Sequence, residues 1–137
     1  MTMTMTMNDR FLFRGKRLDN GEWVQGGLSW FNNGSGSYFI ACHWGLEKKY
    51  PDDIEVDPAT IGQCTGLKDK NGKLIFEGDI CQYETGGICY IYWNDEQANF
   101  DLKGVNYGYV SLIFDIYSAC RMEIIGNIHD NPELLNR

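Results

Sequence analysis

The sequence is poor in several features that announce particular classes of protein. Its 137 residues hold twelve lysines and arginines against nineteen aspartates and glutamates, for a formal net charge of -7. A field of that sign argues against nucleic-acid binding by general electrostatic attraction and leaves a local basic patch for such a role. No run approaches the ~20 apolar residues that a helix needs to cross a bilayer, so we expect no membrane partner.

Histidine and paired cysteines are scarce as well. The chain has two histidines, His43 and His129, and no Cys-x-x-Cys pair. Zinc sites show short ligand spacings, and an odd number of cysteines fits reduced thiols in a cytosol better than a disulfide framework. We therefore predict no metal, no cofactor and a cytoplasmic location. The cysteines, which we expect to act as small apolar residues, are Cys42, Cys64, Cys81, Cys89 and Cys120.

The first residues alternate methionine and threonine, with no basic flank and no long apolar centre. This is not a secretory signal. We predict that residues 1–8 are a disordered leader, or that translation starts at Met7; an extra edge strand is the alternative, because threonine at period two suits a strand. The length then leaves residues 9–137 as a single domain.

Glycine is abundant, at sixteen residues, and proline is rare, at three. Short β-rich runs separated by turns dominate the chain. Asn20-Gly21 and Asn71-Gly72 predict hairpins, because the tightest hairpin turn puts both central residues at positive φ. Cys81 and Cys89 flank a further predicted turn and face each other across it. The predicted strands are 11–14, 23–25, 74–76, 79–83, 88–93, 100–102, 109–114 and 122–128.

Short strands separated by tight turns favour a small barrel or a strongly bent sheet. The predicted fold class is therefore mostly β, with an SH3-like barrel over residues 57–137 and an N-terminal β-hairpin extension over residues 9–56. The charged stretch 46–57 is interpreted as a solvated connector. A short C-terminal helix is expected after Asn131-Pro132, because asparagine caps helices and proline suits the first helical position.

Residues 57–80, with the sequence DPATIGQCTGLKDKNGKLIFEGDI, closely resemble the YopX family of small phage and prophage proteins. The family hallmark is Gly-Gln-aromatic-Thr-Gly-Leu-Lys-Asp-Lys-Asn-Gly-Lys running into Glu-Gly-Asp-Ile. This chain departs from it at Cys64, and again at His129, where the family usually has aromatic residues. The resemblance implies a β-rich fold with an SH3-like barrel, a bacterial or phage cytoplasmic setting, homo-oligomers and no established reaction. Flanking pieces that are also similar are residues 11–16, 21–24 and 124–135.

Four carboxylates fall in or beside this string: Asp57, Asp69, Glu77 and Asp79. Paired carboxylates can do acid-base chemistry or hold Mg²⁺. Turn chemistry explains the same residues better, because aspartate accepts hydrogen bonds from nearby backbone N–H groups. We therefore predict no catalytic site. The predicted structural turn residues are Asp69, Asn71, Gly72, Gly78 and Asp79.

Two segments are candidates for binding. Rings bracket an Asn/Gly/Ser loop between Trp30-Phe31 and Tyr38, which is the composition of an adaptable contact surface. Three lysines, Lys68, Lys70 and Lys73, surround the second Asn-Gly turn. They can touch a phosphate backbone, although alternation with acidic residues favours a solvated turn.

The functional prediction is a non-enzymatic phage or prophage accessory protein that binds a bacterial host or phage protein. An acidic surface suits a basic partner surface. The alternative is a nucleic-acid-binding module that uses a local lysine and aromatic patch. An enzyme that uses the central carboxylates is a third and weaker reading.

Overall fold

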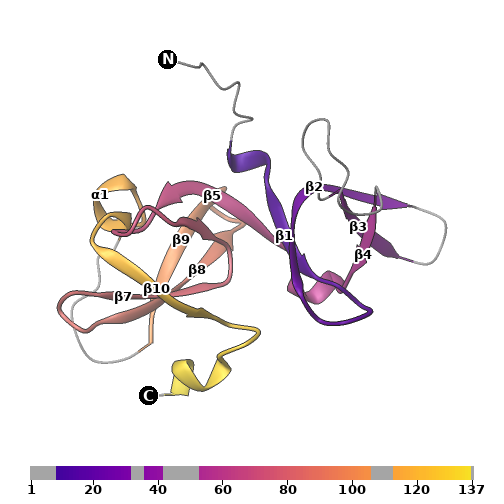
Figure 1. The fold of residues 1–137 in the computed structure, drawn as a ribbon. Coiled ribbons are helices and arrows are strands. Elements are labelled where there is room, and N and C mark those ends of the chain that lie inside the picture. Colours follow the sequence, from indigo (N-terminus) through magenta and orange to yellow (C-terminus); the bar gives the residue numbers. More distant parts are fainter. Residues whose placement is uncertain (1–8, 32–35, 42–52, 106–112, 137) are drawn as a thin grey trace, which may run out of the picture. The chain divides into compact units, whose positions relative to one another are not determined.

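The computed structural model describes residues 9–31, 36–41, 53–105 and 113–136, without the side chain of Phe31. The predicted leader over residues 1–8 lies outside this range. The described chain forms two compact units that divide after Cys64 (Figure 1). The sequence placed the boundary between its two regions at residue 57. The N-terminal unit, up to Cys64, and the C-terminal unit, from Thr65, are described in turn.

The N-terminal unit is an antiparallel sheet of short strands in the order β4-β3-β2-β1-β5 (Figure 1). Strand β5 begins in this unit, where it pairs with β1, and ends in the C-terminal unit, where it lies beside β6. Two 3-10 helices, Asp9–Phe11 and Pro58–Thr60, accompany the sheet. The strands are β1 (Phe13–Lys16), β2 (Trp23–Phe31), β3 (Ser37–Ala41), β4 (Ile54–Val56) and β5 (Gly62–Lys68).

Strand β4 curls back toward the end of β1. It pairs with β3 and also forms a bridge between Val56 and Arg17, in which the Asp57 N–H donates to the Lys16 carbonyl at 2.8 Å. Curling encloses a small apolar interior whose buried side chains are Ile40, Ile54 and Val56. Part of the predicted connector 46–57 is therefore a strand, because its apolar residues fill this interior. Residues 42–52 lie outside the described chain.

Both Asn-Gly pairs form hairpin turns, but with other geometry than expected. Only the glycines take positive φ, 73° at Gly21 and 80° at Gly72. The Gly21 N–H donates to the Arg17 carbonyl at 2.9 Å, and the Asn20 side chain accepts from the Glu22 N–H at 2.9 Å. The loops are longer than two residues, so asparagine stays at negative φ and only glycine supplies the left-handed residue.

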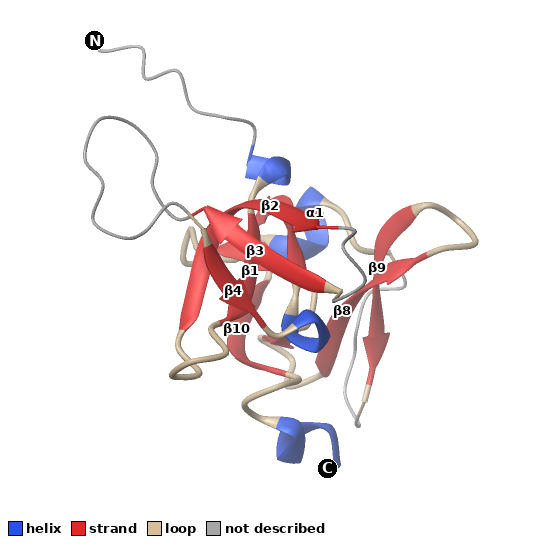
Figure 2. Cartoon of the chain, turned by 90° about the vertical axis from the view of Figure 1, so that its right-hand side faces the viewer, coloured by secondary structure: helices blue, strands red, loops and turns tan. Residues whose placement is uncertain are grey.

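The C-terminal unit contains a second antiparallel sheet in the order β10-β7-β8-β9. Figure 2 labels three of its strands, β8, β9 and β10. Its core groups Ile75, Cys81, Cys89, Ile91 and Met122, all without exposed surface, with further apolar residues around them. A 3-10 helix, Pro132–Asn136, follows the last strand. The named elements are β6 (Leu74–Phe76), β7 (Asp79–Tyr83), β8 (Ile88–Asn94), β9 (Asn99–Gly104), α1 (Ile116–Ala119) and β10 (Met122–Asn127).

The predicted mostly-β class is confirmed, and the strands form two antiparallel sheets. Across the described residues the strands form no closed SH3-like barrel. In the C-terminal unit, one backbone hydrogen bond of 2.9 Å, from the Lys70 N–H to the Met122 carbonyl, joins the turn after β5 to the edge strand β10. The next contact with β10 is made by the Asp69 side chain, which accepts from the Ile124 N–H, so backbone pairing does not continue. The described part of the chain has no helix long and apolar enough to cross a membrane.

Two elements near the C-terminus differ from expectation. Helix α1 was not anticipated; a capping box, in which the Asp115 side chain and Ser118 exchange hydrogen bonds, stabilises its four residues. Of the predicted strand 109–114 only Ile113 and Phe114 are described, and neither is in a strand. The predicted helix after Asn131 is the 3-10 helix Pro132–Asn136.

The cysteines of the hairpin β7–β8 face each other as predicted. Cys81 and Cys89 are register partners, both are wholly buried, and neither forms a disulfide. Burial raises the pKa of Cys89 to about 12, because the apolar core disfavours the thiolate. Cys64 is buried and Cys120 is exposed, whereas Cys42 lies outside the described residues.

Replacing Gly26 by alanine should destabilise the fold. An added Cβ would collide with the backbone carbonyl of Ala41, and a backbone group cannot move aside as a flexible side chain can. We expect a loss of about 1–3 kcal/mol in unfolding free energy, measured by urea titration. Gly27→Ala is the matched control, because its Cβ would meet nothing within 4 Å. Equal effects of the two substitutions would contradict the packing of β2 against β3.

Thiol labelling should separate the described cysteines by burial. In the native protein at about pH 8, iodoacetamide should modify Cys120 and spare Cys64, Cys81 and Cys89, because only thiolates that reach solvent react. Peptide mapping by mass spectrometry gives the site of each label, and unfolding in urea provides the positive control for the buried cysteines. Rapid native labelling of Cys89 would show that its environment is open.

Candidate functional site

The turn between β5 and β6 is organised by the carboxylate of Asp69. Its Oδ1 accepts hydrogen bonds from the backbone N–H groups of Asn71 and Lys73, both at 2.9 Å. Its Oδ2 accepts from the Ile124 N–H on β10 at 3.1 Å. The Gly72 N–H donates to the Asp69 carbonyl at 3.0 Å. The two carboxylate oxygens thus close the turn and fasten it to another strand.

The electrostatics of Asp69 follow from this geometry. Only 5% of the residue is exposed, and burial by itself raises the pKa of its carboxyl. Hydrogen bonds from the N–H groups of Ile124, Lys73 and Asn71, with the positive charge of Lys73, outweigh burial and hold the pKa below its ordinary value. The group is therefore an ionised acceptor that three backbone N–H groups bind, which is a structural role.

The three candidate lysines surround this turn, and all are exposed. The Lys70 ammonium lies 4.0 Å from the Glu123 carboxylate, and the Asn71 side chain donates to Glu123 at 3.3 Å. Lys73 lies close enough to Asp69 to lower its pKa. Lys68 is the last residue of β5. Carboxylates beside two of the three lysines weaken the positive field that a phosphate backbone needs.

The Glu77-Gly78 turn is closed by a second buried carboxylate. The Phe76 N–H donates to Asp79 Oδ2 at 2.8 Å, and Asp79 is only 2% exposed. Gly78 takes a φ of 93°, a conformation that other residues rarely adopt. Its N–H donates to the Ile91 carbonyl at 2.8 Å, and its carbonyl accepts from Ile128 at 2.9 Å. Backbone hydrogen bonds thus join the Glu77-Gly78 turn to strand β8 and to the residue that follows β10.

Asp57 also serves the backbone, since its side chain accepts from the Ala59 N–H at 3.0 Å at the start of a 3-10 helix. Across the described residues, no group of three or more histidine, cysteine, aspartate or glutamate side chains is arranged to hold a metal ion. The described contacts of Asp57, Asp69 and Asp79 all favour the structural interpretation of these carboxylates.

The aromatic candidates lie on the hairpin β2–β3. Trp30 and Tyr38 are register partners, so their side chains share one face of the sheet. Ile40 lies on the same face, and so does Val56, the register partner of Tyr38 on β4. This face therefore continues into the buried interior of the unit. Trp30 lies at its outer end and is 56% exposed. Residues 32–35 of the predicted loop, and the side chain of Phe31, lie outside what is described.

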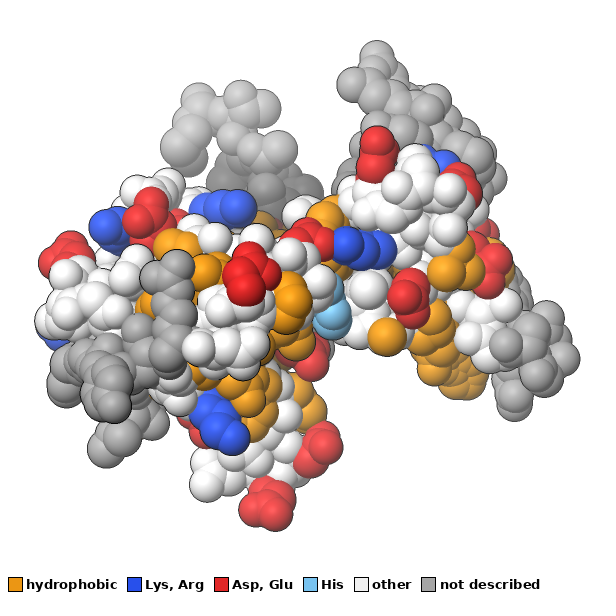
Figure 3. Space-filling view, turned by 90° about the horizontal axis from the view of Figure 1, so that it is seen from below, with side chains coloured by type: hydrophobic (Ala, Val, Ile, Leu, Met, Phe, Trp, Pro, Cys, Tyr) orange, Lys and Arg blue, Asp and Glu red, His pale blue; other side chains and the backbone are white. Residues whose placement is uncertain are grey.

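The predicted binding residues are divided between the two units. Trp30, Phe31 and Tyr38 belong to the N-terminal unit, whereas Lys68, Lys70 and Lys73 belong to the C-terminal unit. Acidic side chains are spread over the visible face rather than gathered in one patch (Figure 3). Other large apolar side chains are exposed around α1, namely Ile113, Ile116 and Tyr117.

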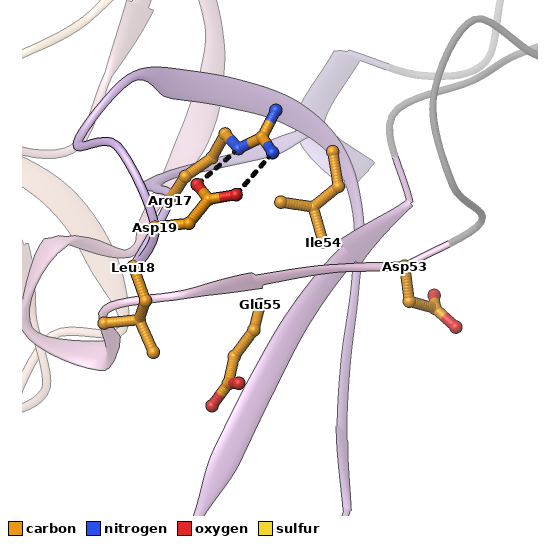
Figure 4. Close-up of a pocket in the computed structure, with 6 residues that line it drawn as sticks. All are labelled: Arg17, Leu18, Asp19, Asp53, Ile54 and Glu55. Atoms are coloured by element: carbon orange, nitrogen blue, oxygen red, sulfur yellow. Dashed lines mark hydrogen bonds and ion pairs between the residues drawn. The ribbon is translucent and has the colours of Figure 1, made fainter.

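A pocket of about 250 Å³ beside β4 was missed by sequence reasoning. Arg17 binds Asp19 through two hydrogen bonds, of 2.8 and 2.7 Å, and this contact lowers the pKa of Asp19. Figure 4 shows Asp53 and Glu55 pointing away from that pair. No short motif announces the pocket, because curling of β4 brings together residues 17–19 and 53–55.

Comparison with known proteins covers both units. The family model described as "YopX protein" matches residues 12–136. Among solved structures, the chain is similar to the crystal structure of protein EF1440 from Enterococcus faecalis, with 27% sequence identity, a TM-score of 0.58, and coverage of 90% of this chain and 96% of that chain. No curated protein matches this chain.

The Asp69 carboxylate predicts a particular pH dependence. Its folded-state pKa is lowered, so its stabilisation is complete above the unfolded-state pKa of about 3.9 and is lost as pH falls through the folded-state value. Asp69→Asn should therefore cost about 2 kcal/mol near neutral pH, the size of a charge-assisted hydrogen-bond contribution. The difference from wild type should shrink in acid. Urea unfolding across this pH range gives both quantities.

Asp95→Asn, at an exposed turn, is the control for loss of one negative charge. A constant difference between wild type and Asp69→Asn from neutral to acid pH would contradict an ionised Asp69.

Proposed function

The chain belongs to the YopX family, and from that membership we propose that it is a phage or prophage accessory protein that acts by binding another protein. In this proposal it works in the bacterial cytoplasm, catalyses no reaction and forms homo-oligomers. The partner is a bacterial host protein or a phage protein.

The observation that carries the proposal is the exposed Trp30 beside Tyr38. Tryptophan and tyrosine dominate the energetics of protein interfaces, because they bury a large apolar area with few rotatable bonds. Trp30 is 56% exposed although its sheet face leads into the apolar interior around Ile40. The Trp30 ring is therefore an exposed apolar surface next to the apolar interior, and a partner protein can cover it.

Charge favours a basic partner. The net charge is -7, and the pocket beside β4 is lined by three carboxylates against one arginine. Complementary charge speeds encounter and excludes acidic competitors, while the aromatic contact supplies affinity. A basic protein surface that meets Trp30 from the outside satisfies both requirements.

The engagement of the central carboxylates supports a non-enzymatic role. A catalytic acid or base must reach substrate, whereas the described hydrogen bonds of Asp69 and Asp79 go to backbone N–H groups of their own turns and of β10. The lysine turn supports nucleic-acid binding less well than Trp30 supports protein binding, because Glu123 and Asp69 lie beside its lysines.

Trp30→Ala should remove a specific partner from affinity capture. Tagged wild-type protein is incubated with bacterial lysate, and retained proteins are compared by quantitative mass spectrometry. We expect one retained protein to fall at least about tenfold with Trp30→Ala, the size of a hot-spot loss. Titration of that protein in purified form then measures the change in Kd.

Tyr117→Ala is the matched control, since Tyr117 is a more exposed aromatic residue, at 75%, in the other unit. Unchanged binding by both variants would contradict the aromatic hairpin as the contact. A gel shift with single-stranded DNA that weakens steeply with salt, and is lost on substitution of Lys68, Lys70 and Lys73 together, would favour the nucleic-acid alternative.

A further inference from the structure

Strand β9 forms one edge of the C-terminal sheet. It is the last strand in the order β10-β7-β8-β9, so among the described strands it has a hydrogen-bonded neighbour on one side only. The Val105 N–H donates to the Ile88 carbonyl at 2.9 Å, and this contact sets the alternation along β9. Odd-numbered residues bond to β8, and the backbone groups of Phe100, Leu102 and Gly104 point outward.

Two further contacts agree with this assignment. The carbonyl of Ile91, the register partner of Leu102, accepts from Gly78 on the β7 side of the sheet. The Leu102 N–H donates at 2.9 Å to the side chain of its neighbour Asp101, which caps this outward donor. A sheet edge with outward backbone donors and acceptors can pair with a strand of another molecule. A charged side chain such as Asp101, bonded to one of these donors, limits pairing with unrelated strands.

The sequence of β9 is complementary to itself. In antiparallel pairing centred on Leu102, each outward residue meets another outward residue: Leu102 faces Leu102, and Phe100 faces Gly104 of a second copy. On the opposite face of the sheet, Asp101 of each copy then faces Lys103 of the other. Both cross-strand charge pairs are attractive.

Other registers lose this match. Moving the centre of symmetry by one residue places either Asp101 opposite Asp101 or Lys103 opposite Lys103, which is repulsive. In a register that pairs odd-numbered with even-numbered residues, the outward backbone N–H and C=O groups of one copy lie opposite residues whose backbone groups already bond to β8. Charge complementarity thus selects a second copy of this chain, in one register, as the occupant of the edge.

We propose that two copies of this chain associate through antiparallel pairing of their β9 strands, centred on Leu102, to form one continuous sheet of eight strands. This inference rests on the homo-oligomers of the proposed function and assigns their contact to strand β9. On association the Leu102 N–H transfers from Asp101 to the backbone of the second copy, and the released Asp101 carboxylate pairs with Lys103. A two-fold axis relates the copies, so both contribute the same residues.

Charge-reversal variants of the full chain test the pairing. Sedimentation velocity over a range of concentrations measures dimer formation by wild type, Lys103→Asp and Asp101→Lys. Each single variant places like charges opposite each other twice, so its dimer dissociation constant should rise roughly tenfold or more. A one-to-one mixture of the two variants restores Asp opposite Lys at both positions and should dimerise as wild type does.

Lys68→Asp is the control, because it changes net charge equally at an exposed residue outside β9. Circular dichroism and thermal melting confirm that each variant folds. A dimer that is weakened equally by Lys68→Asp and Lys103→Asp, or that the mixture does not restore, overturns the β9 contact while self-association stands. A wild-type chain that stays monomeric at all concentrations overturns both.

Discussion

The Asp69 carboxylate is the contact on which the C-terminal unit depends most directly. An ionised carboxylate on a buried residue is stable only where hydrogen-bond donors replace its hydration, and here the backbone N–H groups of Asn71, Lys73 and Ile124 do so. Two of these donors belong to the carboxylate's own turn, and the third belongs to β10. One side chain therefore shapes a hairpin and also ties it to the edge of another sheet.

This constraint explains why the most recognisable part of the sequence is scaffold. Asp69 and Asp79 are both buried acceptors, and Gly72 and Gly78 supply the positive φ that the two turns require. With the central string committed to turns, the proposed contacts with other molecules are assigned to surfaces whose sequences are less distinctive. The hairpin of Trp30, the pocket beside β4 and the edge strand β9 are such surfaces.

Local patterns predicted much of this protein. The two Asn-Gly hairpins, the facing of Cys81 and Cys89 and the turn role of Asp69 follow from residue types over a few positions, because turn chemistry and strand alternation are local. Sheet closure is not local. The predicted barrel requires hydrogen bonds between distant strands, and these are replaced at one junction by a side chain. Helix α1 was missed because four residues give no helical period.

From the amino-acid sequence alone came the β-rich class, the family resemblance and the positions of the turns, since each depends on near neighbours along the chain. Tertiary structure decided which residues meet. It brought Ile124 to Asp69, curled β4 to join residues 17–19 with 53–55, and left β9 at an edge. The physical reason is that strand pairing links segments far apart in the chain, and no local preference specifies the partner.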